Sequence, residues 1–183
     1  MIRIIGGMFR GRKLRTPKGL ATRPVLGRIR EALFNVIGDI GNYRVLDLYS
    51  GTGAIGIEAL SRGAQSAVFV DSGFRQCTII RQNLSDLNIS EEVIKSDVIR
   101  TIVKLDKSNR QFDFIFADPP YEKGLGLETL ETVSEKNILA EKGILALTVR
   151  SSEEFPKLSG HFEQIFNRLY GDTRLILYMR KKV

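Results

Sequence analysis

Short apolar runs alternate with helical patterns along most of this chain, and that alternation limits the fold more than any other feature. Residues 44–49, 66–71, 92–97, 112–117 and 143–149 read as buried strands, with helices predicted from about 54, 74, 98 and 126. Two further runs, 162–169 and 173–180, flank Tyr170-Gly171-Asp172 and predict a closing hairpin. The pattern predicts an α/β fold with a mostly parallel, seven-stranded sheet, helices on both faces and a C-terminal antiparallel hairpin.

Apolar spacing also predicts which helix faces are buried. Leu26, Ile29, Leu33 and Val36 recur three or four residues apart and indicate a helix before the first strand. Phe74, Cys77, Ile80, Leu84 and Leu87 do the same for the helix after the second strand.

The positive charge is concentrated at the amino terminus. The chain has a net charge of +7, yet residues 1–30 carry nine Lys and Arg and no Asp or Glu. The remainder is nearly neutral, so the basicity belongs to one arm. Such an arm is typical of a polyanion-binding protein, with nucleic acid favoured over an acidic membrane surface or a merely solvated tail. Among these basic residues, the candidate nucleic-acid contacts are Arg10, Arg12, Lys13, Arg23, Arg28 and Arg30.

Composition narrows the remaining classes. One cysteine, Cys77, cannot form an internal disulfide, which suits a reducing compartment. The amino terminus lacks a signal-peptide pattern, and no run of about 18 apolar residues predicts a membrane span. We therefore expect a cytoplasmic protein with no membrane partner. Without His and Cys clustering, no metal site is predicted.

A glycine-rich loop follows the first predicted strand. Residues 51–56, Gly-Thr-Gly-Ala-Ile-Gly, let a ligand approach the unpaired N–H groups of a helix start. Their spacing, with Asp71 twenty residues beyond Gly51, also fits a dinucleotide-binding dehydrogenase. Asp47 favours S-adenosylmethionine instead, because a carboxylate there repels a pyrophosphate and attracts the ammonium group of the methionine end.

Three carboxylates, Asp47, Asp71 and Asp97, fall at the ends of successive strands, where open α/β sheets bind ligands. Asp71 is predicted to accept from ribose hydroxyls, and Asp97 with the backbone N–H of Val98 to meet adenine. Each taken singly fits a helix N-cap equally well. The candidate cofactor residues are Asp47, Ser50, Gly51, Thr52, Gly53, Asp71, Ser72, Asp97 and Val98.

The tetrapeptide Asp118-Pro119-Pro120-Tyr121 ends the fourth strand and is the candidate catalytic motif. An exocyclic base amine is a poor nucleophile because its lone pair is delocalised into the ring. The Asp118 carboxylate and the Pro119 carbonyl can accept from its hydrogens and free that lone pair. Consecutive prolines keep the turn rigid, and Tyr121 offers a face on which a flipped base can stack. Methyl transfer by this route requires no metal.

Together these motifs resemble the RsmD family of bacterial 16S ribosomal RNA guanine-N2 methyltransferases. Asp-Leu-Tyr-Ser-Gly-Thr-Gly (47–53) and the tetrapeptide are similar to amino methyltransferases generally. The segments 3–7, 10–14, 22–24 and 28–35 narrow the resemblance. Val25 and Gly27 depart from the family, which has a threonine and an acidic residue there.

The resemblance implies a Rossmann-like class I methyltransferase that methylates one guanine N2 of small-subunit RNA. It also implies that 16S RNA or the small ribosomal subunit is the partner. We divide the chain into a basic, RNA-binding extension (1–40) and a catalytic domain (41–183), and we expect a monomer.

Three rivals stay open at this point. An adenine-N6 DNA or RNA methyltransferase uses the same tetrapeptide. A dehydrogenase would bind NADH and be indifferent to Asp118, and a catalytically silent module would bind RNA without methyl transfer.

Overall fold

The computed structural model describes residues 2–17, 24–121 and 124–181. Arg23, one of the expected RNA contacts, lies outside these ranges. No helix within them is both long and apolar enough to cross a bilayer.

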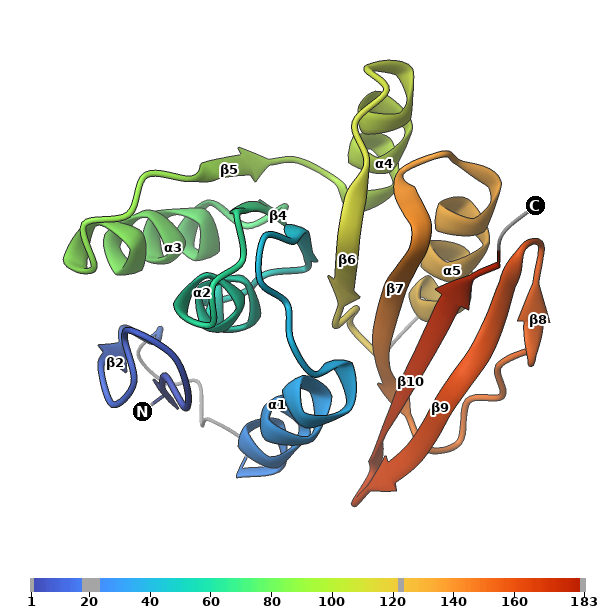
Figure 1. Cartoon of the computed structure of the whole chain (residues 1–183), viewed down its shortest axis with the longest axis horizontal. Coiled ribbons are helices and arrows are strands. Elements are labelled where there is room, and N and C mark those ends of the chain that lie inside the picture. The colour runs from blue at the N-terminus through green and yellow to red at the C-terminus, as the bar shows by residue number, and fades with distance from the viewer. Residues whose placement is uncertain (1, 18–23, 122–123, 182–183) are drawn as a thin grey trace.

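A central sheet organises the molecule (Figure 1). Its strands are β3 (Arg44–Leu48), β4 (Ser66–Asp71), β5 (Glu92–Lys95), β6 (Phe112–Ala117), β7 (Leu139–Arg150), β8 (Leu158–Ser159), β9 (Phe162–Tyr170) and β10 (Thr173–Arg180). They lie in the order β5-β4-β3-β6-β7-β10-β9-β8. Pairing is parallel from β5 to β7 and antiparallel from β7 to β8. The predicted α/β fold, mostly parallel with a C-terminal antiparallel hairpin, is confirmed.

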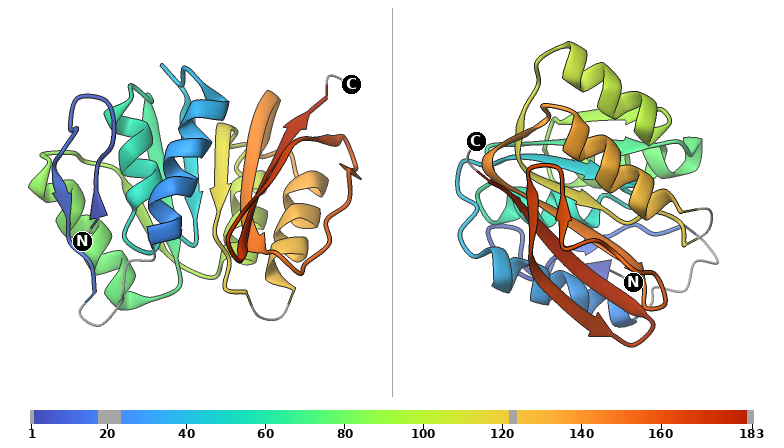
Figure 2. Two further views of the ribbon diagram at one scale, coloured as in Figure 1. Left: turned by 90° about the horizontal axis from the view of Figure 1, so that it is seen from below. Right: turned by 90° about the vertical axis from the view of Figure 1, so that its right-hand side faces the viewer.

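Helices cover both faces of this sheet. They are α1 (Pro24–Ile37), α2 (Ala54–Ser61), α3 (Phe74–Asp86), α4 (Val98–Lys107) and α5 (Leu125–Glu135). Apolar residues of α1, α2 and α3 share one core cluster with the sheet. Those of α4 and α5 share the cluster on the opposite face, and the right-hand view of Figure 2 shows these layers.

The sheet differs from the expectation at two places. The two-residue β8 adds an eighth strand that is too short to leave a sequence pattern. Strand β7 begins at residue 139 rather than 143, because pairing with β6 continues through a register shift. Lys142 sits at that irregularity with a φ of 58°. The Glu-Lys-Gly sequence of residues 141–143 is typical of a loop, yet the strand bends there and continues.

Two residues predicted to face the core do not. Ile29 and Leu33 of α1 are buried, but Val36 is 42% exposed and Phe34 packs inward instead. In α3, Phe74 is 70% exposed, whereas Cys77, Ile80 and Leu84 are buried. Both exceptions stand at helix ends, where the chain turns away from the layer beneath it.

The amino-terminal arm is folded against the body rather than projecting from it. Strands β1 (Ile2–Arg3) and β2 (Lys13–Leu14) form a small antiparallel sheet of their own beside α2. Ile4 and Leu14 belong to the core cluster of α1, α2 and α3. The division at residues 40 and 41 stays a prediction, and the two proposed parts share this cluster.

The topology places a ligand site at one edge of the sheet. The connections reverse direction between β3 and β6, and ligands of open α/β sheets bind beyond the strand ends at such a point. Leu48 pairs with Ala117 at those ends. The glycine loop after β3 and the tetrapeptide after β6 therefore leave the sheet side by side.

Candidate active site

The carboxyl group of Asp47 lies inside the protein behind the glycine loop. Asp47 is 1% exposed, and Gly56 N–H in the first turn of α2 donates to its Oδ2 at 3.0 Å. Burial raises the pKa of Asp47 well above that of a free carboxyl group, and the nearby charges of Asp118 and Asp71 raise it further. The side chain thus fixes the start of α2, while its attraction for an ammonium group stays a prediction.

The loop after β3 is held in a shape that its glycines permit. Gly51 and Gly53 have φ values of 57° and 75°, a region that L side chains disfavour. A Cβ on Gly53 would approach Phe69 and Ile80 to 3.3 Å, whereas one on Gly51 would meet nothing nearer than 3.9 Å. Ser50, predicted as a ligand contact, is buried and ties this loop to Asp47 and Val70 through its hydroxyl. The loop is closed on its inner side and open at Gly51.

Asp71 joins this loop to the next one. Its Oδ2 accepts from Gly51 N–H at 2.9 Å and its Oδ1 from Gly73 N–H at 2.8 Å. Each carboxylate oxygen has a second lone pair, which leaves the acceptor capacity expected for ribose hydroxyls. Ser72, which follows Asp71 in the chain and was predicted as a ligand contact, is exposed.

Asp97 has a structural task. It is the N-cap of α4, and its Oδ1 accepts from Arg100 N–H at 2.9 Å. The alternative that the sequence left open, a helix cap, is therefore realised here. Val98 is buried in the core behind it. An adenine contact would fall to the remaining oxygen of Asp97 and to backbone groups.

The candidate catalytic tetrapeptide is braced by two later strands. The hydroxyl of Thr148 in β7 donates to Oδ1 of Asp118. The hydroxyls of Tyr121 and of Thr173 in β10 are 2.8 Å apart. Both threonines are buried, whereas Asp118 and Tyr121 are partly exposed. Pro119 is buried and Pro120 exposed. The guanidinium carbon of Arg150 lies 5.8 Å from the ring centre of Tyr121. The Tyr121 side chain is partly exposed.

Sequence reasoning missed both threonines. Thr148 lies 30 residues from Asp118 along the chain, and Thr173 lies 52 residues from Tyr121. The one available signal for Thr148 was a polar residue within the apolar run from Ile144 to Val149, and Thr173 left no comparable signal.

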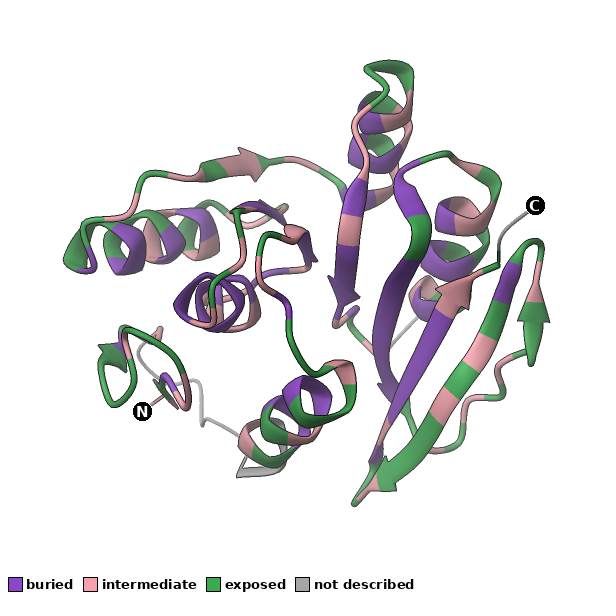
Figure 3. Cartoon of the chain, viewed as in Figure 1, coloured by how far each residue is buried: buried purple, intermediate pink, exposed green. Residues whose placement is uncertain are grey.

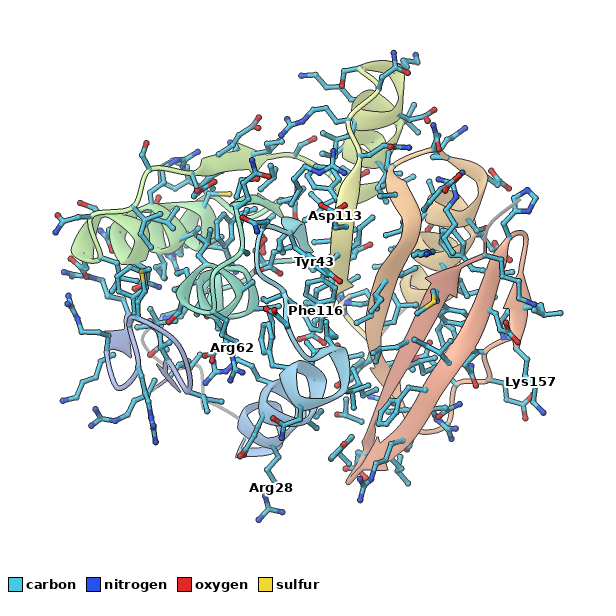
Figure 4. The ribbon with its side chains drawn as sticks, in the orientation of Figure 1. Arg28, Tyr43, Arg62, Asp113, Phe116 and Lys157 are labelled. Carbon is cyan, nitrogen blue, oxygen red and sulfur yellow. The ribbon has the colours of Figure 1, made fainter. Side chains whose placement is uncertain are left out.

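A buried carboxylate that the sequence did not single out anchors the arm. Glu58 of α2 is fully buried and accepts from the backbone N–H groups of Ile5 and Gly6, each at 2.8 Å. Arg62 donates to the same side chain at 2.9 Å, and Figure 4 shows Arg62 between the arm and α1. All residues of α2 from Gly56 onward are buried (Figure 3), which explains why a carboxylate there needs these partners.

The basic side chains of the arm divide into two groups. Arg10, Arg12, Lys13 and Arg28 are exposed, and Figure 4 shows Arg28 directed away from α1. Arg30 corrects the expected set, because it is only 7% exposed and donates to the backbone oxygen of Arg3. Its Nε lies 3.7 Å from Glu58. Arg30 braces the arm from inside and has no surface to offer RNA.

No metal cluster is apparent in this region. Within residues 2–17, 24–121 and 124–181, no group of three or more His, Cys, Asp or Glu side chains is arranged to hold an ion.

Comparison with known proteins agrees with this geometry. A family described as "Conserved hypothetical protein 95" matches residues 2–179. "Putative rRNA methyltransferase YlbH" of Bacillus subtilis is 32% identical over 98% of this chain and 100% of its own length. "Ribosomal RNA small subunit methyltransferase D" of Escherichia coli strain K12 is 30% identical over 98% of this chain and 90% of its own. A solved structure described as "Putative methyltransferase yhhF from Escherichia coli" superimposes with a TM-score of 0.88, at 31% identity and 98% coverage of both chains.

Proposed function

This chain belongs to the Conserved hypothetical protein 95 family, the methyltransferase family that the RsmD resemblance indicated, and from that premise we propose that it methylates the exocyclic N2 of one guanine in 16S ribosomal RNA. S-adenosylmethionine is the proposed donor. The observation that carries the proposal is the pairing of Leu48 with Ala117, which sets the glycine loop and the tetrapeptide at adjacent strand ends.

The residues present suit S-adenosylmethionine. Gly51 leaves the outer side of the loop open, so a ligand can approach its backbone closely. Asp71 keeps acceptor capacity on both carboxylate oxygens while its amide partners hold it still. When bound, the cofactor supplies a methyl group on a positively charged sulfur.

The tetrapeptide then prepares the amine. Asp118 accepts from one N–H of the guanine amino group, and Pro119 accepts from the other through its carbonyl. These two acceptors would draw the nitrogen towards tetrahedral geometry and make its lone pair available. As the N–C bond forms and the methyl–sulfur bond breaks, S-adenosylhomocysteine would leave and the Asp118 carboxylate would take up the proton that the nitrogen releases. Thr148 keeps the carboxylate of Asp118 pointing one way, so the acceptor is in place before the base arrives. Tyr121 stacks on the flipped base.

The exposed basic residues give the RNA a place to bind. Arg10, Arg12, Lys13 and Arg28 are the proposed phosphate contacts, and Arg23 belongs to the same proposal on sequence alone. If they neutralise phosphates, log affinity falls with log salt by about 0.7 to 0.9 per contact. Replacing these exposed side chains with glutamine flattens that slope, whereas an unchanged slope would place the contacts elsewhere.

The experiment that tests the function is transfer of labelled methyl from S-adenosylmethionine to unmodified 16S RNA and to small subunits, followed by mass spectrometric mapping. We expect one N2-methylguanine. Asp118→Ala reduces the rate by roughly 10²–10⁴-fold, as loss of a positioned proton acceptor does elsewhere. Asp39→Ala, an exposed carboxylate far along the chain from the motif, serves as the control. Label in N6-methyladenine would support the rival methyltransferase, and a full rate in Asp118→Ala would overturn the mechanism.

A further inference from the structure

Asn83 is a buried polar residue that the proposed chemistry does not use. It lies in α3 and is 1% exposed. Its side chain amide makes three hydrogen bonds, and all three go to backbone groups outside α3. Two go to the arm and one goes to the cofactor loop. Asn83 is therefore a bridge between two segments that the sequence places far apart.

The arm end of this bridge is firmly held. The Oδ1 of Asn83 accepts from Arg15 N–H at 2.7 Å, and its Nδ2 donates to Arg15 O at 3.3 Å. The amide thus pairs with both backbone groups of one residue, as a neighbouring strand would. The Arg15 guanidinium also reaches Asp86 of the same helix, with nitrogen–oxygen distances of 2.6 and 3.0 Å. Arg12 donates to the backbone oxygen of Asp86 at 2.8 Å.

The other end of the bridge supports the glycine loop. The Nδ2 of Asn83 donates to Thr52 O at 2.9 Å, between the two glycines with positive φ. Ile80, one turn earlier on the same buried face of α3, is among the side chains nearest to Gly53. One face of α3 therefore fixes both the loop and the arm, and the same amide nitrogen bonds to each.

Lifting the arm leaves this amide half-satisfied in a buried place. Its Oδ1 loses its donor, and its Nδ2 loses one of two acceptors. A buried amide without partners is unfavourable, so it turns or admits water, and either change removes support from the Thr52 carbonyl. Conversely, a ligand that holds the loop in place keeps Asn83 oriented to receive the arm.

We infer that Asn83 is a positioning residue that couples the arm to the cofactor loop, so that RNA and S-adenosylmethionine each strengthen the binding of the other. This inference rests on the proposed function for its two ligands. Linkage requires the two effects to be equal, because one coupling free energy describes both. We expect a factor of at least about five, the lower end of typical couplings.

The test measures the dissociation constant of S-adenosylhomocysteine, an unreactive product, by calorimetry on the full chain. It is measured with and without saturating RNA from the small subunit, and the RNA dissociation constant is measured with and without S-adenosylhomocysteine. In the wild type each ligand tightens the other about fivefold or more. Asn83→Asp keeps the acceptor for Arg15 N–H but removes the donor to Thr52, and it brings the coupling factor close to one. Gln82→Ala, an exposed neighbour on α3, keeps the wild-type factor.

Asp86→Ala provides an independent route to the same answer. It loosens the arm at an exposed site without touching Asn83 or the loop, so it changes the coupling factor even if Asn83 variants are unstable. A wild-type factor near one, or full coupling in Asn83→Asp or in Asp86→Ala, overturns the inference. If the wild type binds both ligands independently, only the coupling fails. If it binds no S-adenosylhomocysteine or no RNA, the proposed function fails.

Discussion

The proposed cofactor side and the proposed catalytic corner of this site are built in different ways. On the cofactor side, Asp47 and Asp71 are held by backbone N–H groups of the loops beside them. At the catalytic corner, Asp118 and Tyr121 are held by the hydroxyls of Thr148 and Thr173, which arrive on later strands. The bonds of the first arrangement span 2 to 20 residues of chain, whereas those of the second span 30 and 52 residues and depend on the later strands β7 and β10. A substitution on the cofactor side should therefore lower ligand affinity, whereas a substitution at the catalytic corner should lower the reaction rate.

Among the substitutions that compare the two sides, the largest expected effect is on cofactor affinity. Asp71→Ala removes a carboxylate that fixes two loop amides and is proposed to accept from ribose. Hydrogen bonds to a charged group contribute about 1.5–3 kcal/mol, so the dissociation constant of S-adenosylhomocysteine rises roughly 10–100-fold in calorimetry. RNA affinity measured without cofactor stays within about twofold. Asp71→Asn, which keeps one oxygen acceptor, falls between. A lost rate with unchanged cofactor affinity would contradict the division.

The next-largest expected effect is on the reaction rate and concerns the catalytic corner. Thr148→Val removes the hydroxyl that orients Asp118 and keeps nearly the same volume, so the single-turnover rate falls about tenfold. The affinity for S-adenosylhomocysteine is unchanged, because the hydroxyl of Thr148 bonds to Ala117 and Asp118 rather than to the glycine loop. Thr148→Ser restores most of the rate. Should serine and valine give the same rate, the hydroxyl has no part in positioning Asp118.

A smaller effect sharpens the same point at Tyr121. Thr173→Val and Tyr121→Phe each remove one partner of a neutral hydrogen bond, which lowers kcat/KM for RNA by about 2–10-fold. The double variant is expected to lose no more than either single variant, because both remove the same contact. Additive losses in this double-mutant cycle would show that the two hydroxyls act separately.

The smallest effect concerns the cofactor side and appears in its pH dependence. Burial raises the pKa of Asp47, so its contribution to stability is complete below the unfolded pKa of about 3.9 and is lost as the pH rises through the folded pKa. Asp47→Asn keeps an oxygen for Gly56 N–H but cannot ionise. Its Tm relative to the wild type should therefore rise by a few degrees between pH 4 and pH 8, without ligand. A constant difference across that range would mean that folding does not raise the pKa of Asp47.

The same contrast explains what the sequence could and could not predict. Periodicity placed every long strand of the sheet and the two-residue turn between β9 and β10 within a few residues, because each is a local pattern. The glycine loop and the tetrapeptide were recognisable because their chemistry is contiguous. Thr148, Thr173 and Glu58 were not, because each acts on a partner 30 or more residues away.

One candidate RNA contact, Arg30, is corrected by the structure because its side chain is buried. Arg30 looked equivalent to Arg28 in a basic run, yet the two lie on different sides of α1 and only Arg28 is exposed. Charge in a sequence gives the sign of a segment but not the direction of a side chain. The buried carboxylate of Glu58, in the middle of an apolar helix, was the signal that an internal cation would be needed.

The docking of the arm onto Glu58 bears on how tightly a nucleic acid can be held. Ile5, Gly6, Phe9 and Arg15 are each fastened to the body by backbone hydrogen bonds to side chains of α2 or α3. The cations between these points are therefore displayed on a preformed scaffold. A flexible tail would surrender backbone freedom, at about 1–2 kcal/mol per residue, when it settled on its target. Here most of that entropy loss has already occurred during folding, so more of the free energy of each phosphate contact contributes to affinity.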